Sequence, residues 1–568
     1  MKLNHRQGAR SSLFAKLFAM LAAVVLFAQV ALPAHAQTAT VIYNFPAYSG
    51  DVCQPEGALT QGRDGYMYGT GGCSSNGTVA VYKISPTGVE KVVVSGLPTG
   101  WAGCDSGLTL GSDGNFYGTC QSGNSTNRGV IYRLTPAGVV TDLHDFTDVT
   151  GDAFPEQPPI QASDGNFYGT TGTPELSHCG TVYQLTAAGA YKTLHTFSGN
   201  DCTSSTLSQA SDGNLYGTLR SCSLAGSVGC VYKISLTGAF KEIYGFTPAT
   251  TGYLPCTGVI QGKDGKLYGA TNEGGANGSG DIYKITTAGG GHAVLHDFNN
   301  PTDASCVNNE NGNTVLLNLL QTTDGNFYGV NPAYGPVGNG SIYKLTSADV
   351  FSAFLFPNPP TEGDQPAGTM IHNTNGLVYG TTPSGGNNAK CFSSVCYGVF
   401  FGVATGNVPF VNLEPTQKSG FVGAKVGIFG QGFSSGSVVK FGGVVAPVTL
   451  SGASYLTATV PAGALTRAVT VTTGATTLTS PQTFKVKPKI MNISPSSGSA
   501  GTLVTINGSG LVQTTTVKFG TVKATTFTVV SDSKVTADVP TGLAAGAVTI
   551  SITTPGGTAT GPTKFTVN

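Results

Sequence analysis

One short motif recurs seven times along the chain and constrains the fold more than any other feature. It reads Asp-Gly-Asn-Phe-Tyr-Gly-Thr at Asp113–Thr119 and again at Asp164–Thr170. Related copies begin at Asp64, Asp212, Asp264, Asp324 and Asn375. Successive copies start 49, 51, 48, 52, 60 and 51 residues apart. A period near fifty residues is typical of a repeat architecture, in which each unit forms one supersecondary element.

Each repeat contains four short apolar segments separated by turn residues. Val81–Ile84 (Val-Tyr-Lys-Ile) and Leu143–Phe146 (Leu-His-Asp-Phe) are examples of two of them. Asp-Gly tolerates the positive φ that a tight hairpin turn requires, and alternation of apolar and polar residues fits strands with one buried face. Four strands in each of seven units predict an all-β fold with a seven-bladed β-propeller.

The two ends of the repeat region are expected to close this propeller. The seventh unit ends at Gly398–Gly402 without a further apolar segment, whereas such a segment, Val41–Phe45, precedes the first unit. The N-terminal strand can therefore complete the last blade, and closure hides sheet edges that would otherwise promote aggregation. By analogy with other propellers, the strand before each Asp-Gly turn lines the central channel.

Composition divides the rest of the chain. Residues 1–36 are predicted to be a secretory signal peptide, because a basic start is followed by an apolar stretch from Leu17 to Leu32 and a small-residue cleavage site before Gln37. A membrane anchor is the alternative, but the apolar stretch is short for a span. We expect the propeller over residues 37–404 and two β-sandwiches over residues 408–487 and 488–568, where short alternating strands recur without cysteine.

Charge and hydropathy limit the classes of partner. Residues 1–36 carry four basic and no acidic residues, which leaves 25 basic against 29 acidic residues in the mature chain. Because the sequence contains no cluster of basic residues that could contact a phosphate backbone, nucleic acid is not an expected partner. No membrane span is expected in the mature chain. No cofactor is predicted, and the oligomeric state stays open.

The twelve cysteines all lie between Cys53 and Cys396, and export permits disulfides there. Pairs that flank one turn or hairpin are the expected bridges. These are Cys53–Cys73, Cys104–Cys120, Cys202–Cys222 and Cys391–Cys396. Four cysteines have no predicted partner: Cys179, Cys230, Cys256 and Cys306. A zinc site is not predicted, because Cys-x-x-Cys pairs and companion histidines are missing.

One level of the predicted channel is rich in amides. The residue three positions before each turn is polar in six of the seven repeats, with Leu110 as the exception. These candidate ligand-binding residues are Gln61, Gln161, Gln209, Gln261, Gln321 and His372. Because an amide both donates and accepts hydrogen bonds, such a ring suits a hydroxyl-rich ligand. The alternative is that each glutamine satisfies backbone groups of the neighbouring blade.

Other residues that could carry chemistry have structural explanations. The repeated Asp is expected to bond its own turn, and the repeated Tyr to pack between blades. A structural role is expected for His144, His195 and His296 in the outer strands. Gly432–Gly436 matches the Gly-x-Ser-x-Gly nucleophile motif but falls in a predicted sandwich turn, where the required strand-to-helix turn is missing. Trp101 is expected to be a buried plug, with an exposed glycan platform as the alternative. No catalytic residue is predicted.

The repeat motif, together with Gly180–Thr186 (Gly-Thr-Val-Tyr-Gln-Leu-Thr), resembles the bacterial GloVer-type tandem repeat over about Val41–Gly402. This resemblance implies secretion or surface display and brings no agreed activity. Both C-terminal stretches resemble the IPT/TIG immunoglobulin-like domain, the second more closely through Thr554–Gly557 (Thr-Pro-Gly-Gly). Such domains imply spacer and adhesion modules more often than catalytic units.

The sequence therefore predicts a secreted or cell-surface, non-catalytic binding or adhesion protein whose propeller recognises an extracellular glycan or protein. The first alternative is a polysaccharide-active hydrolase or lyase, which would show two or more acids, or an acid and a histidine, converging at one end of the channel. The second alternative is a purely structural envelope protein, which would show no pocket with convergent polar groups.

Overall fold

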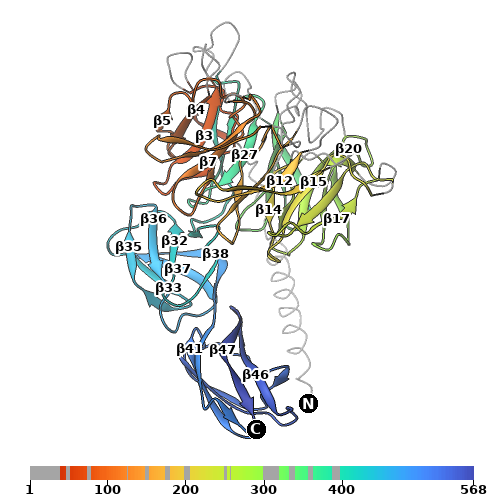
Figure 1. The fold of residues 1–568 in the computed structure, drawn as a ribbon. Coiled ribbons are helices and arrows are strands. Elements are labelled where there is room, and N and C mark those ends of the chain that lie inside the picture. The colour runs from red at the N-terminus through yellow and green to blue at the C-terminus, as the bar shows by residue number, and fades with distance from the viewer. Residues whose placement is uncertain are drawn as a thin grey trace, which may run out of the picture. The chain divides into compact units, whose positions relative to one another are not determined.

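The computed structural model describes residues 39–45, 52–72, 79–123, 126–147, 152–172, 180–197, 205–224, 226–247, 252–255, 257–298, 319–331, 340–355, 363–386 and 397–568. Over these residues the regular structure consists of β-strands alone, which confirms the all-β class (Figure 1). The same residues include no helix of the length and hydropathy that a membrane span requires. The expected signal peptide lies outside them.

Seven antiparallel sheets lie between Ala39 and Val403 in the described residues, and each contains the strands of one repeat. We number these sheets as blades 1 to 7 in the order of the repeats. Blade 1 contains β2 (Thr60–Gln61), β3 (Met67–Gly72), β4 (Val79–Ile84) and β5 (Glu90–Val94). Blade 2 contains β6 (Thr109–Leu110), β7 (Phe116–Cys120), β8 (Val130–Leu134) and β9 (Val140–Asp145). Blade 3 contains β10 (Ile160–Gln161), β11 (Phe167–Thr170), β12 (Thr181–Leu185) and β13 (Tyr191–Thr196).

The next three blades keep this order, and blade 5 has one additional strand. Blade 4 contains β14 (Ser208–Gln209), β15 (Leu215–Leu219), β16 (Cys230–Ile234) and β17 (Phe240–Gly245). Blade 5 contains β18 (Gly252–Pro255), β19 (Ile260–Gln261), β20 (Leu267–Gly274), β21 (Asp281–Ile285) and β22 (Ala293–Asp297). Blade 6 contains β23 (Leu320–Gln321), β24 (Phe327–Asn331), β25 (Ser341–Leu345) and β26 (Phe351–Leu355).

The N-terminal strand closes the seventh blade, as the sequence predicts. Blade 7 contains β27 (Ala367–His372), β28 (Val378–Thr382), β29 (Val399–Val403) and β1 (Ala39–Asn44). β1 pairs antiparallel with β29, from Ala39 opposite Val403 to Asn44 opposite Val399. The short first strands of neighbouring blades contact each other at three junctions, β2 with β6, β14 with β19 and β23 with β27. These contacts support a channel lined by first strands, and a closed ring of seven blades stays a prediction.

The repeated motif builds both the turn and the contact between blades. Asp113 Oδ1 accepts the backbone N–H of Asn115 at 3.1 Å, and Oδ2 accepts the hydroxyl of Tyr117 at 2.9 Å. Gly114 adopts a φ of 86°, which a residue with a side chain disfavours. The ring of Tyr117 then stacks on Phe167 of the next blade, with centroids 3.8 Å apart. The expected turn role of Asp and packing role of Tyr are therefore confirmed.

Residues 411–568 form two β-sandwiches with the same strand order. The first has one sheet of β30 (Asn412–Leu413), β32 (Lys425–Phe429), β36 (Tyr455–Thr459) and β35 (Val448–Leu450). Its other sheet has β31 (Ser419–Gly420), β38 (Thr476–Val486), β37 (Arg467–Thr473), β33 (Val438–Phe441) and β34 (Val444–Ala446). A buried core that includes Ile428, Phe441 and Phe484 fills the space between them.

The second sandwich repeats this arrangement. One sheet has β39 (Lys489–Ser494), β41 (Leu503–Ser509), β45 (Lys534–Asp538) and β44 (Phe527–Ser531). The other has β40 (Ser497–Gly498), β47 (Gly557–Val567), β46 (Gly546–Thr554), β42 (Thr516–Phe519) and β43 (Val522–Lys523). Ile506, Phe519 and Phe565 lie in its core. Alternating strands with one buried face therefore produce sandwiches, as predicted.

Candidate functional site

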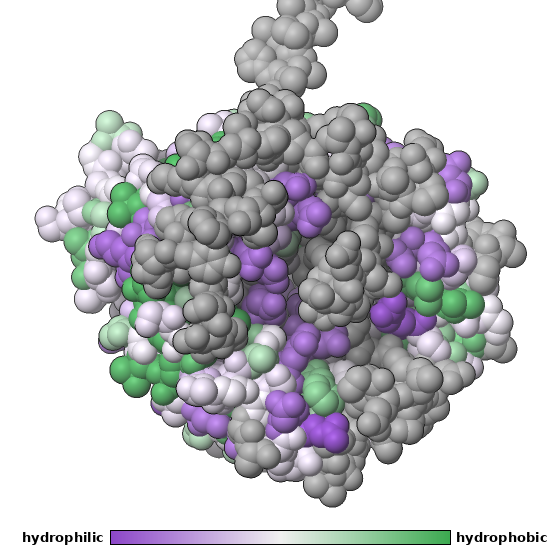
Figure 2. All heavy atoms as spheres, turned by 90° about the horizontal axis from the view of Figure 1, so that it is seen from above, coloured by the Kyte–Doolittle hydropathy of each residue, from purple (hydrophilic) through white to green (hydrophobic). Residues whose placement is uncertain are grey.

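The two ends of the first strands differ chemically, and they define the two ends of the predicted channel. Each first strand runs from a preceding segment, which we call the approach segment, to the Asp-Gly turn. We call the two ends of the channel the approach end and the turn end. In the view of Figure 2, hydrophilic side chains gather around a hollow in the middle of the repeat region.

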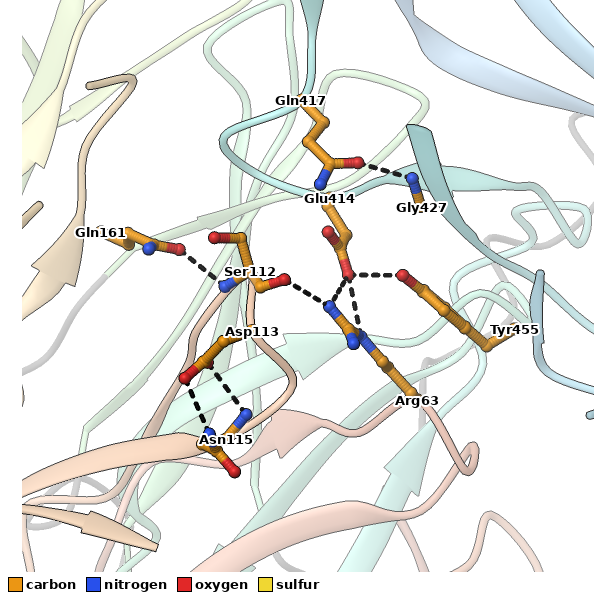
Figure 3. Close-up of polar contacts among 9 residues, drawn as sticks. All are labelled: Arg63, Ser112, Asp113, Asn115, Gln161, Glu414, Gln417, Gly427 and Tyr455. Atoms are coloured by element: carbon orange, nitrogen blue, oxygen red, sulfur yellow. Dashed lines mark hydrogen bonds and ion pairs between the residues drawn. The ribbon is translucent and has the colours of Figure 1, made fainter. Parts of the chain in front are cut away.

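Glutamine side chains at the turn end join each blade to the preceding one. Gln161 Oε1 accepts the backbone N–H of Ser112 in blade 2 at 2.8 Å (Figure 3). Its Nε2 donates to the carbonyl oxygen of Gly165 at 2.8 Å. The same pair of bonds recurs at Gln209, Gln261 and Gln321. These amides satisfy backbone groups, which is the alternative to a ligand-binding ring. A ligand would have to displace these bonds.

Removing one of these amides is expected to weaken the blade junction. Gln161→Ala loses two hydrogen bonds beside solvent, so we expect a loss of about 1 kcal/mol of unfolding free energy, measured by urea denaturation. Gln161→Glu keeps the acceptor for Ser112 but places a carboxylate against Gly165 O, so it should be at least as destabilising at pH 7. An unchanged urea midpoint in Gln161→Ala would show that the two hydrogen bonds of Gln161 do not contribute to the free energy of unfolding.

The first position without glutamine is Leu110, at the junction between blades 1 and 2. Arg63 of blade 1 takes over the junction there, because its Nη2 donates to the carbonyl oxygen of Ser112 at 2.8 Å. Its guanidinium also binds Glu414 Oε1, with Nε at 2.9 Å and Nη2 at 2.5 Å. The same carboxylate oxygen accepts the hydroxyl of Tyr455 at 2.7 Å (Figure 3). The change from Gln to Leu thus coincides with docking of the sandwich.

The other position without glutamine, His372, packs against Phe410, which directly precedes the first sandwich. Its ring centroid lies 4.7 Å from that of Phe410. Burial lowers the pKa of His372 to about 4, so the imidazole is neutral at pH 7. Gln61 Nε2 donates to Thr374 Oγ1 at 3.1 Å, and that hydroxyl donates to the carbonyl oxygen of Gly430 in the sandwich at 3.3 Å. The turn end is therefore occupied by contacts within the protein at blades 1, 2 and 7.

Carboxyl groups meet at the approach end instead. Glu56, Asp105 and Glu156 stand at one position of three successive approach segments, each five residues before the position of the glutamine ring. In each segment the residue two positions earlier has a positive φ; these residues are Gln54, Gly103 and Phe154. Counting back from the glutamine positions would have found these acids in the sequence, although our sequence analysis did not single them out.

Two of these acids contact each other across a blade junction. Ala58 and Gly107 form a parallel bridge, which brings the approach segments of blades 1 and 2 together. Asp105 is also the charged neighbour that acts on the carboxyl group of Glu56. Surrounding protein contributes most to raising the pKa of Glu56 to about 8, and repulsion and the hydrogen bond from Asp105 add to it. Glu56 is nevertheless exposed to solvent.

The third acid, Glu156, differs from this pair because it has a cationic neighbour, Arg220. Burial raises the pKa of Glu156 to about 7, and the nearby Arg220 of blade 4 opposes that rise. A Cβ added to Gly172 would lie 3.2 Å from Glu156 Oε1, which places the carboxyl group beside β11 of its own blade. The approach end thus combines two neighbouring carboxyl groups with a third that lies near a guanidinium.

The outer histidines hold neighbouring blades together, as a structural role predicts. His144 stacks on Tyr191 of blade 3 with ring centroids 3.8 Å apart, and His195 stacks on Phe240 of blade 4 at 4.0 Å. His296 stacks on Phe351 of blade 6 at 3.5 Å. At the equivalent junction between blades 4 and 5 the stacked pair is Tyr244 with His292, at 4.8 Å, which sequence analysis did not identify.

These stacks predict that acid destabilises the repeat region. Burial lowers the pKa of His195 below its ordinary value of 6.5, so the unfolded chain binds more protons than the folded chain as pH falls. The stabilisation is complete above about pH 6.5 and declines below it. His195→Tyr keeps an aromatic ring, as at Tyr244, and should show a smaller fall in Tm between pH 7 and pH 5. Equal slopes in both proteins would contradict this role.

The disulfides confirm one expected bridge and correct another. Cys104 and Cys120 are joined, as predicted. Cys222 is joined to Cys230, so the predicted Cys202–Cys222 bridge is wrong. The physical reason is local: Cys222 and Cys230 flank the hairpin between β15 and β16, and their Cα atoms lie 5.9 Å apart, within the range that a disulfide spans.

The remaining expected bridges involve residues outside the described ranges. Cys53 is disulfide-bonded, while Cys73, Cys391 and Cys396 are not described, so these bridges stay predictions. Glu242 lies near Cys222 and Cys230, but those sulfurs are joined to each other and offer no thiolate to a metal.

Two further sequence features have structural roles. Trp101 is only 7% exposed, and its ring lies 5.6 Å from that of Tyr132, which confirms the buried plug. Gly432–Gly436 lies in the connection between strands β32 and β33 of the first sandwich. Ser434 there uses its hydroxyl oxygen to accept the backbone N–H of Gly436 at 3.3 Å. This turn joins two strands, so it lacks the strand-to-helix geometry of a nucleophile elbow.

Comparison with solved structures finds weak similarity. A streptogramin B lyase is 16% identical, with a TM-score of 0.42 over 63% of this chain and 96% of that chain. A fungal alcohol oxidase in complex with copper is 13% identical, with a TM-score of 0.43 over 80% of this chain and 100% of its own. The surface glycan-binding protein PbSGBP-B from Prevotella bryantii is 16% identical, with a TM-score of 0.22 over 28% of this chain and 41% of its own.

Family models give a clearer result. No curated protein matches the chain. The IPT/TIG domain matches residues 411–486 and 488–567. The Gloeobacter/Verrucomicrobia repeat matches residues 30–220 and 203–412, which together are more than half of the chain. The protein therefore belongs to the Gloeobacter/Verrucomicrobia repeat family and carries two IPT/TIG domains after its repeats.

Proposed function

We propose that the protein is an exported, non-catalytic binding protein whose repeat region recognises an extracellular glycan at the approach end of the channel. The observation that carries this proposal is the placement of Glu56, Asp105 and Glu156 at one position of three successive blades. Carboxyl groups accept hydrogen bonds from sugar hydroxyls, and a protonated carboxyl also donates one. The expected signal peptide and the disulfides support export.

The approach end is favoured over the glutamine ring because the exposed carboxyl group of Glu56 can still form hydrogen bonds with a ligand. Glutamine amides at the turn end already bond backbone groups of two blades. Glu56 is exposed, and it forms no ion pair with a described cationic side chain. The IPT/TIG domains would hold the repeats away from the cell or add contacts of their own.

A glycan array with the mature chain, residues 37–568, tests this proposal. The variant Glu56→Gln/Asp105→Asn should lose binding, because it removes the ionisable groups while keeping side-chain size. The variant Gln161→Ala/Gln261→Ala/Gln321→Ala should keep binding below its lowered Tm. Loss of binding only in the glutamine variant would move the site to the turn end. Absence of glycan binding in the unmodified chain would overturn the proposal and direct the search to protein partners.

An enzyme acting on extracellular polysaccharide is the second candidate, because acids do converge at one end of the channel. Two catalytic carboxyls of a glycosidase stand about 5–9 Å apart to leave room for sugar and water, so this activity requires such a separation between Glu56 and Asp105. Release of reducing ends from a polysaccharide that the array identifies, abolished in Glu56→Gln, would establish this activity.

A further inference from the structure

The charged residues are divided unevenly between the repeats and the two sandwiches. Residues 37–407 contain 14 basic and 26 acidic residues, whereas residues 408–568 contain 11 basic and 3 acidic residues. The repeats therefore carry a formal net charge of −12, and the sandwiches carry one of +8. Because the two values largely cancel, the net charge of the mature chain hides this difference. The two parts of the chain attract partners of opposite sign.

The few acidic side chains of the sandwiches lie away from one particular sheet in each domain. Glu414 binds Arg63 of blade 1, and Asp532 and Asp538 accept hydrogen bonds from groups of their own domain. Asp538 lies in β45 of the four-stranded sheet, and Asp532 lies in the connection between β44 and β45. The strands of the five-stranded sheets contain no Asp or Glu. Lysines on those sheets therefore have no acid beside them in the same sheet.

The five-stranded sheet of the second sandwich presents three lysines on its outer face. Lys518 of β42 lies directly opposite Lys523 of β43, so both side chains are on one side of the sheet. Lys518 and Lys564 each precede a phenylalanine of the core, so their side chains point away from that core. Like charges directly opposite each other destabilise a sheet. None of the ion pairs among the described residues involves these three lysines, so their charge is available to a partner.

Hydroxyl groups occupy much of the rest of this face. On its other side Lys518 pairs with Ser551, and Ser551 in turn pairs with Thr560. The hydroxyl oxygens of Thr553 and Thr558 lie 2.9 Å apart on the same pair of strands. The exposed large apolar side chains of this sandwich lie outside the sheet; they are Met491, Leu503, Val512 and Val530. A face of amino groups and hydroxyls suits a hydrated polyanion better than a membrane interface, where apolar side chains insert as well.

The first sandwich has an equivalent face of lower charge. Lys440 occupies the position of Lys518 in the Val-Lys-Phe-Gly motif that the two domains share. The hydroxyl oxygens of Thr472 and Thr477 lie 2.9 Å apart, as in the second sandwich. The residue opposite Lys440, however, is Val445, which is 57% exposed. The second sandwich is therefore the one in which two lysines face each other across the strands.

We propose that the outer face of the five-stranded sheet in the second IPT/TIG domain binds an extracellular polysaccharide that carries carboxylate or sulfate groups. The amino groups of Lys518, Lys523 and Lys564 pair with those anionic groups, and the serine and threonine hydroxyls bond sugar hydroxyls. The same polymer repels the acidic repeats, so the repeats stay available for a ligand of their own. This face is separate from the approach end of the channel, and the inference does not rest on the proposed function.

Surface plasmon resonance on the immobilised mature chain tests the site with alginate, which carries carboxylates, with dextran sulfate, and with uncharged dextran. We expect saturable binding of at least one charged polymer and none of dextran. That binding should weaken by about tenfold or more between 50 and 500 mM NaCl, because salt screens the lysines and competes for the polymer.

A triple variant and its matched control make the expectation specific to this face. Lys518→Gln/Lys523→Gln/Lys564→Gln should weaken binding by about tenfold or more. The control removes three exposed lysines from outer strands of the repeats and should leave binding unchanged; it is Lys91→Gln/Lys192→Gln/Lys241→Gln. Circular dichroism confirms that each variant is folded. Equal losses in both triple variants, or no saturable binding of either charged polymer, would overturn the inference.

Charge reversal at one lysine separates binding from folding. Glutamate in Lys523→Glu would stand opposite Lys518 and form a cross-strand ion pair. We therefore expect its Tm to stay level or rise by about 1 °C, while polymer binding falls by about tenfold or more. Polymer binding that is unchanged in Lys523→Glu would overturn the site.

The remaining outcomes assign the face to a different partner or to none. Salt-sensitive binding to phosphatidylglycerol vesicles without binding to either charged polymer would assign it to a lipid surface and overturn the inference. Salt-sensitive self-association in sedimentation, again without polymer binding, would assign it to the acidic repeats of a second copy and overturn it equally. Glu56→Gln/Asp105→Asn should leave polymer binding unchanged, so failure of the proposed glycan site and failure of this face are distinguishable.

Discussion

Arg63→Met is expected to lower the free energy of unfolding of the mature chain by about 2–4 kcal/mol. The reason is that the carboxyl group of Glu414, whose side chain is 2% exposed, would lose both guanidinium bonds. A buried carboxylate left without its partner costs far more than an exposed ion pair contributes. Urea unfolding followed by circular dichroism measures the loss, and fluorescence of Trp101 reports separately on the repeats.

Two control variants make this expectation specific. Arg63→Met/Glu414→Gln should recover part of the loss, because Gln carries no charge and still accepts the Tyr455 hydroxyl. Lys284→Met breaks an ion pair of 2.7 Å with Asp349, whose side chain is 43% exposed, and should cost less than about 1 kcal/mol. If Arg63→Met costs no more than Lys284→Met, the contact does not stabilise the junction between the repeats and the first sandwich.

The second large effect is expected at the glycine of Tyr-Gly-Thr. Gly69→Ala should destabilise the protein by about 1–3 kcal/mol, because the new Cβ would lie 2.6 Å from the hydroxyl oxygen of Tyr82 and 2.7 Å from its Cζ. Tyr82 is 0% exposed, so its ring has no room to move away. The loss should appear in the fluorescence of Trp101 on urea unfolding, since that residue packs in the adjoining blade.

A glycine in the same strand provides the control. A Cβ on Gly72, at the end of β3, meets no atom within 4 Å, and its backbone does not have a positive φ. Gly72→Ala should therefore be neutral or slightly stabilising. Comparable losses in Gly69→Ala and Gly72→Ala would mean that strand flexibility, and not the Tyr82 ring, explains why glycine stands at this position.

Much of the fold follows from local chemistry that the sequence displays. Asp113 and Gly114 form their turn with atoms at most four residues away, so every copy of the motif predicts the same hairpin. Strand Ala39–Asn44 could be assigned to the last blade because its counterpart is missing after Val403. The Cys222–Cys230 bridge was not predicted. The prediction paired cysteines on either side of an Asp-Gly turn, and that spacing does not indicate that β16 brings Cys230 close to Cys222.

The candidate site was less accessible to sequence reasoning. Glutamine at five of seven equivalent positions indicated a ring, but whether Gln161 faced a ligand or Ser112 depended on a neighbouring blade 49 residues away. The acids Glu56 and Asp105 share one register, which counting from the turns reveals. Whether the two acids are neighbours depends on how the approach segments of blades 1 and 2 pair. A local sequence pattern does not predict that pairing.

The sequence by itself determined the elements that depend on near neighbours: the Asp-Gly turns, the alternating strands and the number of repeats. Only the tertiary structure decided which side chains of different blades meet, because those contacts depend on the packing of blade on blade. Arg63 binds Glu414, 351 residues further along the chain, and Leu110 stands where glutamine would otherwise clamp the junction. The long-range contacts thus explain the exceptions to the repeat, while short-range chemistry explains the repeat itself.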